Sequence, residues 1–155
     1  MVARTLNSSA VELDKKDRAI LKALQLDARI SLSSLGKKIG LSQPAVSERV
    51  RKLEDAGVID GYAARINLKA VGLGLQAIVR VRTTHEHIQR YLALFKTLPA
   101  VLEVFRVTGD DCFVLRCAFG EPGELETVVD ALAAYGSVTT SLVLSHPMSQ
   151  AAPLG

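Results

Sequence analysis

The sequence predicts an α+β protein with two domains, an N-terminal three-helix domain of the winged helix-turn-helix class and a C-terminal βαββαβ domain of the ferredoxin-like class. Apolar residues recur at helical spacing through residues 14–57, whereas strand-like and helix-like segments alternate over residues 75–145. Of the 155 residues, 48% are apolar and 23% are charged, which is typical of a chain that buries a core and excludes a disordered protein.

The first helix is expected to begin after Asp14, whose carboxylate can cap it, and to end near Asp27. Asp17 lies in the first turn, where a negative charge interacts favourably with the helix dipole. The buried face of this helix would carry apolar residues at helical spacing, namely Ile20, Leu21 and Leu24.

The next two helices have the spacing of a helix-turn-helix motif. Ser31 can cap a short helix, and Gly40 ends it because glycine readily takes the left-handed conformation after a helix. Ser42 can cap the following helix, which has Pro44 in its first turn, where a missing N–H costs nothing, and which Gly57 ends. Two helices separated by a tight turn that contains glycine form such a motif. The buried face of the later helix would carry Val46, Val50 and Leu53.

The rest of the chain alternates between strands and helices. Residues 58–66 look like a short strand or wing, and Gly72 and Gly74 mark a linker. Later elements are expected at 75–82 (strand), 87–98 (helix), 101–108 and 112–119 (strands joined by a hairpin turn at Gly109-Asp110-Asp111), 123–135 (helix) and 137–145 (strand). The expected limits are 12–61 for the helical domain, 62–74 for a hinge strand and linker, 75–146 for the βαββαβ domain and 147–155 for a tail.

The charge is distributed unevenly, although the net charge is only +3. Residues 1–69 contain 13 Lys and Arg against 8 Asp and Glu, which gives +5, and residues 70–155 contain 6 against 8, which gives −2. A basic half joined to a mildly acidic half suggests a nucleic-acid-binding module followed by a second module. Chance clustering of charges on solvated helix faces is the alternative interpretation.

Simple features exclude several classes of protein. No apolar run approaches the roughly 18 residues of a membrane span, and residues 1–14 lack the continuous apolar segment of a secretory signal. Cys112 and Cys117 are too few for a disulfide framework, and their spacing on an expected strand puts them on opposite faces. A reduced, cytoplasmic protein is therefore expected.

Motifs for catalysis are missing from the sequence. His85 and His87 form an H-x-H pair, but no cysteine or acidic cluster supplies further ligands at metal-site spacing. Asp110 and Asp111 are adjacent acids on an expected turn, where such residues are more often turn formers than an acid–base pair. The chain also lacks a nucleophile elbow, a P-loop and a dinucleotide fingerprint, so neither an enzyme, a metal site nor a cofactor is expected.

The helix that follows Ser42 has the features of a DNA-recognition helix. With its apolar face inward, its polar residues point outward, and helix-turn-helix proteins place the N-terminal part of this helix in the major groove. There Gln43 can bond adenine, Glu48 can accept from cytosine and Arg51 can reach guanine. Phosphate contacts, which position the helix and give salt-dependent affinity, are expected from Arg29, Lys37, Lys38, Arg49 and Lys52. Ser42, Pro44 and Ser47 complete the candidate DNA-binding set. An ordinary three-helix core with solvated charges is the alternative.

Six runs of residues form a distinctive pattern: Leu13-Asp14-x-x-Asp17-x-x-Ile20-Leu21, Asp27-Ala28-Arg29-Ile30-Ser31, Gly40-Leu41-Ser42, Arg49-Val50-x-x-Leu53-Glu54-x-x-Gly57-Val58-Ile59, Gly61-Tyr62 and Val107-Thr108-Gly109-Asp110. Over residues 12–146 this pattern resembles the Lrp/AsnC (leucine-responsive) family of transcriptional regulators. The resemblance implies a winged helix-turn-helix joined to an ACT-like βαββαβ domain that senses amino acids. It also implies double-stranded DNA as a partner, dimers that close into larger rings, commonly octamers, and an amino-acid effector held between dimers near the turn that contains Gly109.

The sequence of this turn departs from the family at one position. Many relatives have G-x-x-D there, whereas Cys112 stands at the fourth position here, with acids at Asp110 and Asp111 instead. An acid is a natural partner for the ammonium group of an effector, so either acid would take its place. Cys112 is interpreted as a small buried apolar residue, with a redox sensor as the alternative. The candidate effector-binding set is Thr108, Gly109, Asp110, Asp111, Cys112, Thr139, Thr140 and Ser141, the last three on the resemblance alone.

Two DNA-binding functions compete at this point. One is a sequence-specific regulator switched by a small molecule. The other is an architectural protein that wraps DNA with little base readout. The ratio of specific to nonspecific DNA affinity at fixed salt distinguishes the two. RNA binding through the sheet would need aromatic residues in an R-G-F-x-F-like pattern, which Phe105 and Phe113 do not form. A small metabolic enzyme is opposed by the missing catalytic site.

Overall fold

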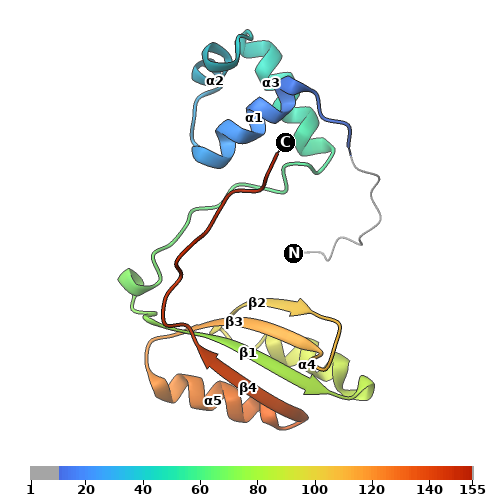
Figure 1. Cartoon of the computed structure of the whole chain (residues 1–155), viewed down its shortest axis with the longest axis vertical. Coiled ribbons are helices and arrows are strands. Elements are labelled where there is room, and N and C mark those ends of the chain that lie inside the picture. Colours follow the sequence, from blue (N-terminus) through green and yellow to red (C-terminus); the bar gives the residue numbers. More distant parts are fainter. Residues whose placement is uncertain (1–10, 155) are drawn as a thin grey trace. The chain divides into compact units, whose positions relative to one another are not determined.

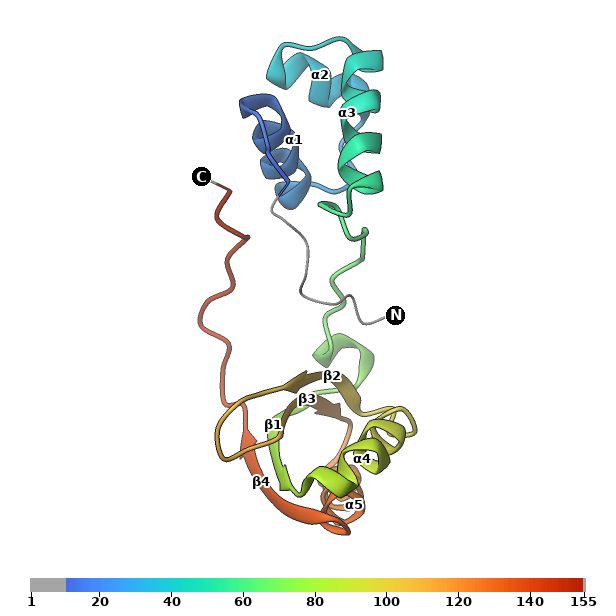
Figure 2. The same cartoon turned by 90° about the vertical axis from the view of Figure 1, so that its right-hand side faces the viewer.

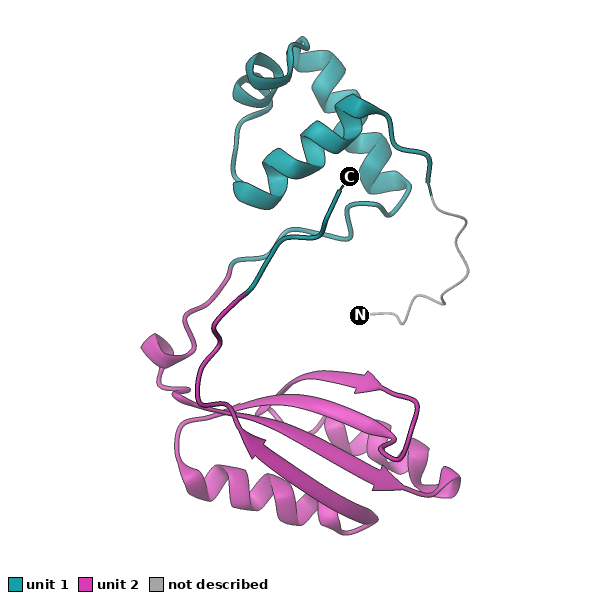
Figure 3. Ribbon diagram, in the orientation of Figure 1, with its two compact units in different colours: residues 1–64, 149–155 teal, residues 65–148 magenta. Residues whose placement is uncertain are grey.

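The computed structural model describes residues 11–154, so the expectation about a secretory signal falls largely on residues 1–10, outside the described part. The described chain forms two compact units (Figure 3). Unit 1 comprises residues up to 64 together with the segment from Ser149, and unit 2 comprises residues 65–148. Each unit has its own hydrophobic core.

Unit 1 contains three helices, α1 (Lys15–Leu26), α2 (Leu32–Ile39) and α3 (Gln43–Asp55) (Figure 1). All three predicted N-caps are confirmed. The Asp14 carboxylate accepts from the Asp17 N–H at 2.8 Å and the Asp17 carboxylate accepts from the Asp14 N–H at 3.1 Å, which is a reciprocal capping box. The hydroxyl oxygens of Ser31 and Ser42 cap α2 and α3 by accepting from the backbone N–H groups of Ser34 and Ala45.

The turn between α2 and α3 is unusually tight. A Cβ atom on Gly36 would lie 2.6 Å from the Leu41 carbonyl oxygen, so a larger residue does not fit there. Gly40 has φ 68°, the left-handed conformation that the sequence predicted for the end of α2. The three helices then enclose a core of Ile20, Leu21, Ala23, Leu35, Val46, Val50 and Leu53.

The expected wing is not present. Residues 58–66 form no strand, and within residues 11–154 every strand belongs to unit 2. A strand needs a partner for its backbone N–H and C=O groups, and within residues 11–154 no strand pairs with this segment. The first residues after Gly57 instead close α3, since the N–H groups of Val58 and Ile59 both donate to the Leu53 carbonyl, at 2.9 and 3.1 Å. The linker also contains a short 3₁₀ helix, η1 (Lys69–Val71), which the sequence did not predict.

Unit 2 has the predicted βαββαβ order. Its elements are β1 (Leu75–Thr83), α4 (Ile88–Phe95) after a 3₁₀ turn η2 (His85–His87), β2 (Val101–Arg106), β3 (Phe113–Phe119), α5 (Pro122–Ala133) and β4 (Gly136–Leu142). The strands form one antiparallel sheet in the order β2-β3-β1-β4. Both helices cover the same face of this sheet (Figure 2).

Alternation along the central strands determines which face is buried. Val79 and Val81 of β1 and Leu115 of β3 are fully buried and pack with Tyr91 of α4 and Leu132 of α5. The intervening residues lie on the face opposite α4 and α5. These include Ile78, Arg80, Phe105, Val114 and Arg116.

The connection between β2 and β3 is longer than predicted. The strands end at Arg106 and resume at Phe113, so a loop over 107–112 replaces the three-residue turn, with Gly109-Asp110-Asp111 in its middle. A register shift between Val101 and Glu103 marks a bulge at the start of β2. β4 likewise ends at Leu142 rather than Ser145, because it pairs with β1 only to Ala77.

Candidate nucleic-acid interface and effector turn

The N-terminal half of α3 presents a polar face to solvent. Val46, Val50 and Leu53 are buried, as predicted, and anchor the helix on the core of unit 1. All candidate DNA-contacting residues are exposed except Arg49, which is half-buried: the exposed set is Arg29, Lys37, Lys38, Ser42, Gln43, Pro44, Ser47, Glu48, Arg51 and Lys52. The structure therefore leaves ten of the eleven candidates open to a ligand.

Arg51 and Glu48 form an ion pair along the exposed face of α3. The Arg51 guanidinium donates to the two carboxylate oxygens of Glu48 at 3.0 to 3.3 Å and to Asp55 at 3.4 Å. The hydrogen bond from Arg51 lowers the pKa of the Glu48 carboxyl, and Lys52, 3.6 Å away, adds to this effect. Glu48 is thus held as a carboxylate, the form that accepts a hydrogen bond from cytosine. Exposed pairs of this kind are weak, so DNA can replace them.

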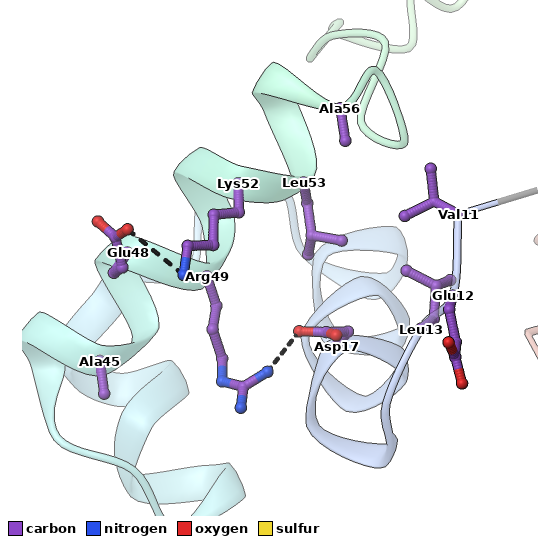
Figure 4. A pocket seen from close by; sticks show the side chains of 10 residues that line it. All are labelled: Val11, Glu12, Leu13, Asp17, Ala45, Glu48, Arg49, Lys52, Leu53 and Ala56. Atoms are coloured by element: carbon purple, nitrogen blue, oxygen red, sulfur yellow. Dashed lines mark hydrogen bonds and ion pairs between the residues drawn. The ribbon is translucent and has the colours of Figure 1, made fainter. Parts of the chain in front are cut away.

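Arg49 points toward α1 rather than along the exposed face. Its guanidinium donates to Asp14 at 2.7 Å. It also donates to Asp17 at 2.7 Å (Figure 4). These two hydrogen bonds raise the pKa of Arg49, and the bond from Arg49 also contributes to the lowered pKa of Asp14. Arg49 therefore links α3 to the capping box of α1. The acids at positions 14 and 17 are the signal that could have indicated this pairing.

The other candidate phosphate contacts lie at helix ends. Lys37 and Lys38 occupy the last turn of α2, directly before the turn that leads into α3. Arg29 follows α1, and its backbone N–H donates to the Asp27 carboxylate at 2.9 Å.

The predicted effector turn is a loop with available backbone N–H groups. The hydrogen bonds that hold it are from the Val107 N–H to the Cys112 carbonyl at 3.2 Å and from the Cys112 N–H to the Val81 carbonyl at 2.8 Å. Gly109 has φ 107°, and the space where its Cβ would stand is open. Asp110 is exposed and Asp111 is half-buried. The loop thus offers N–H groups and carboxylates at one end of the sheet.

Cys112 is half-buried rather than buried. Its thiol donates to the Thr83 carbonyl at 3.2 Å, so it ties the loop to the end of β1. Cys117 is fully buried, and burial raises the pKa of its thiol to about 11, which disfavours the reactive thiolate.

The remaining effector candidates lie elsewhere on the sheet. Thr139 and Ser141 are on the uncovered face of β4, whereas Thr140 pairs with the buried Val79 and lies on the other face. The loop 107–112 connects β2 with β3, and β1 separates β3 from β4. In the sheet of one chain, β1 therefore lies between these hydroxyl groups and the strand that follows the loop.

Other candidate chemistry finds little support in the described part of the chain. His85 and His87 lie in η2, and residues 11–154 contain no group of three or more His, Cys, Asp or Glu that could hold a metal ion. In the same range no helix is long and apolar enough to cross a membrane.

Both units match models of known protein families. A model of the AsnC-type helix-turn-helix domain matches residues 13–54, and a model of the Lrp/AsnC ligand binding domain matches residues 76–153. The chain is 38% identical over 152 residues to the HTH-type transcriptional regulator AldR of Mycolicibacterium smegmatis, covering 94% of this chain and 88% of that protein.

Solved structures agree with these matches. LrpC of Bacillus subtilis has a TM-score of 0.85 at 30% identity, covering 90% of this chain and all of that one. A transcriptional regulator from Neisseria meningitidis, solved in complex with L-methionine, has a TM-score of 0.85 at 31% identity, covering 92% and 97%. The predicted α+β class, with a helix-turn-helix unit and a βαββαβ unit but without the wing, and the predicted family are confirmed. This chain belongs to the Lrp/AsnC family of helix-turn-helix transcriptional regulators.

Proposed function

We propose that this regulator reads specific DNA sequences with the exposed face of α3 and changes its DNA affinity when an amino acid or similar small effector binds unit 2. The observation that carries the proposal is the exposed polar set on α3, which includes Gln43, Glu48 and Arg51 above a fully apolar buried face. Gln43 would bond adenine, Glu48 cytosine and Arg51 guanine, while Lys37 and Lys38 would contact phosphates.

The proposed effector is an α-amino acid. Its carboxylate would accept from the backbone N–H groups of residues 108–111, and Asp110 or Asp111 would bind its ammonium group. A relative in complex with L-methionine supports this ligand class. Thr139 and Ser141 would join the site from a second copy of the chain, since within one chain β1 lies between β4 and the strand that follows the loop.

Self-association is part of the proposal. The face of the sheet opposite α4 and α5 carries Ile78, Phe105 and Val114, and Phe105 is 51% exposed. Pairing two such faces would cover these apolar side chains, and we propose dimers that close into larger rings, of which the octamer is the expected form.

Mapping of bound DNA across the genome, with and without a panel of amino acids, tests the proposal. Discrete sites whose occupancy changes with one amino acid are expected. The architectural alternative predicts broad coverage and nearly equal affinity for operator and random DNA at fixed salt. Isothermal calorimetry with the same panel, including L-methionine, tests the effector directly, and the absence of heat with every amino acid would contradict it.

A further inference from the structure

Unit 1 contains an apolar groove on the side of α1. One wall is formed by Leu21 and Leu24 of α1 with Ala28, which follows α1, and the other by residues 58–63, which follow α3. The second wall is fixed in place, because the Tyr62 hydroxyl donates to the Glu54 carboxylate of α3 at 2.9 Å and Val58 and Ile59 bond back to Leu53. The groove is therefore part of the folded helix-turn-helix unit and lies apart from the candidate DNA-contacting residues.

Two residues near the end of the same chain, Ala152 and Leu154, also line this groove. Leu154 packs against the hydrophobic core of unit 1, and its carbonyl oxygen accepts a hydrogen bond from the Arg18 guanidinium at 3.1 Å. Leu154 is half-buried, whereas all residues from Leu144 to Pro153 are exposed. The tail is thus held at one anchoring residue, at the end of an exposed span.

The position of the anchor has a topological consequence. The chain passes from unit 1 to unit 2 after Ala64, completes the sheet with β4, and returns to unit 1 at Ser149. The helix-turn-helix unit is therefore connected to unit 2 by the linker that follows α3 and by the tail that follows β4. Because the tail begins at an edge strand of the sheet, it forms a second covalent connection between β4 and the surface of α1.

We propose that residues 149–154 are an intramolecular latch of the DNA-binding unit, with Leu154 as the group that seats in the groove and Arg18 as the residue that holds it. The occupant is the tail of the same chain rather than a ligand or another protein. Arg18 accordingly serves the latch and not DNA, although it belongs to the basic half of the sequence. The latch depends neither on the DNA sequence bound nor on the identity of an effector.

Hydrogen exchange measured by mass spectrometry on the full chain tests the latch. Leu154→Asp places a charge in the apolar groove, and exchange in residues 18–28 and 58–63 is expected to rise several-fold. Leu144→Asp is the matched control, because Leu144 lies in the exposed stretch between β4 and the latch and is 97% exposed, and it is expected to change nothing. Arg18→Gln removes the charged donor and is expected to raise exchange in the same peptides.

The outcomes separate the latch from its alternatives. Peptides from α2 are an internal reference, and a rise there as large as in α1 would mean general loosening of the unit and would overturn the proposal. Equal exchange in the wild type and in Leu154→Asp would also overturn it. The measurement is repeated at lower protein concentration. If residues 18–28 and 58–63 stay protected from exchange, the tail in the groove belongs to the same chain. If their protection is lost on dilution, the groove holds the tail of a second copy, which would overturn the proposal.

Discussion

Arg51 and Lys38 are exposed cations with different expected roles. Arg51 lies on the recognition helix, so Arg51→Ala is expected to weaken operator binding by about 1–3 kcal/mol and to relax base preference at one position. Lys38 lies at the end of α2, so Lys38→Ala is expected to weaken binding to all DNA about equally and to reduce the salt dependence. Fluorescence anisotropy with operator and random duplexes over a salt series measures both. Equal losses on the two duplexes for Arg51→Ala would contradict base reading.

Arg49 was predicted as a phosphate contact, and its ion pairs with Asp14 and Asp17 favour a structural role. Arg49→Ala is expected to lower the thermal midpoint of unit 1 by a few degrees, since it removes two 2.7 Å hydrogen bonds between α3 and α1. Asp17→Asn is expected to have a similar effect, and the double variant should lose less than the sum of the two, because both changes remove the same interaction.

The salt dependence of DNA binding distinguishes the two roles of Arg49. A residue that contacts a phosphate contributes to the slope of affinity against salt concentration, whereas a residue that only positions α3 does not. We expect the slope of Arg49→Ala to equal that of the wild type. If Arg49→Ala reduced the salt slope as much as Lys38→Ala does, Arg49 would contact a phosphate after all.

Gly136 is a position where no side chain fits. A Cβ there would lie 2.2 Å from the Arg82 carbonyl oxygen and 3.1 Å from the Tyr91 hydroxyl oxygen, so Gly136→Ala must displace the start of β4. A loss of roughly 1–3 kcal/mol in the unfolding free energy of unit 2 is expected. Gly123→Ala is the control, since a Cβ at Gly123 in α5 meets nothing within 4 Å. Chemical denaturation monitored by circular dichroism compares them, and equal stability of the two variants would contradict this reading.

The loop 107–112 is the element on which effector binding is expected to depend. Leucine at position 109 must adopt φ 107°, which is unfavourable for an L-residue, and its side chain would occupy the open space beside the loop N–H groups. Gly109→Leu is expected to abolish the effect of an amino acid on DNA affinity and to leave effector-free DNA binding unchanged. Anisotropy titrations with and without the effector measure this, with a thermal melt as the control for folding. An unchanged response would reject the site.

Element types were predictable where local interactions determine them. The caps at Asp14, Ser31 and Ser42 and the left-handed Gly40 depend on residues within one helical turn, and all four are confirmed. Strand ends were less predictable because they depend on how far the neighbouring strand extends, as the early end of β4 shows. The prediction of a wing was wrong for a related reason, since a strand-like sequence over residues 58–66 does not by itself supply a partner strand.

Long-range side-chain pairs account for most of what sequence patterns could not reveal about the site. Arg49 looked like an outward cation from helical spacing alone, and its partners lie 32 and 35 positions earlier in the chain. Arg18 and Leu154 are separated by 136 positions, and no spacing rule connects them. The exposed residues of α3 were predictable because a buried stripe at helical spacing leaves the opposite face to solvent.

The two units place DNA recognition and effector binding in separate cores, so any response has to pass between them or through an assembly of chains. Uneven charge agrees with this division, since the helical half carries +5 and the remainder −2 by the residue counts given above. An effector acts only through different affinities for two states of the protein. If the effector site is completed by a second copy, as proposed above, assembly and effector binding are thermodynamically coupled.

The uncovered face of the sheet is where we expect chains to pair. Ile78 lies on this face in the central strand β1, and Ile78→Glu would bury a charge in the interface without touching the core beneath α4 and α5. The wild-type chain is expected to sediment as a dimer or larger at micromolar concentration, and Ile78→Glu is expected to shift it toward the monomer. Gln89→Glu adds the same charge at an exposed position of α4. It should leave the dimer intact, because α4 lies on the opposite side of the sheet. A wild-type chain that sediments as a stable monomer, or equal dissociation in the two variants, would exclude pairing through this face.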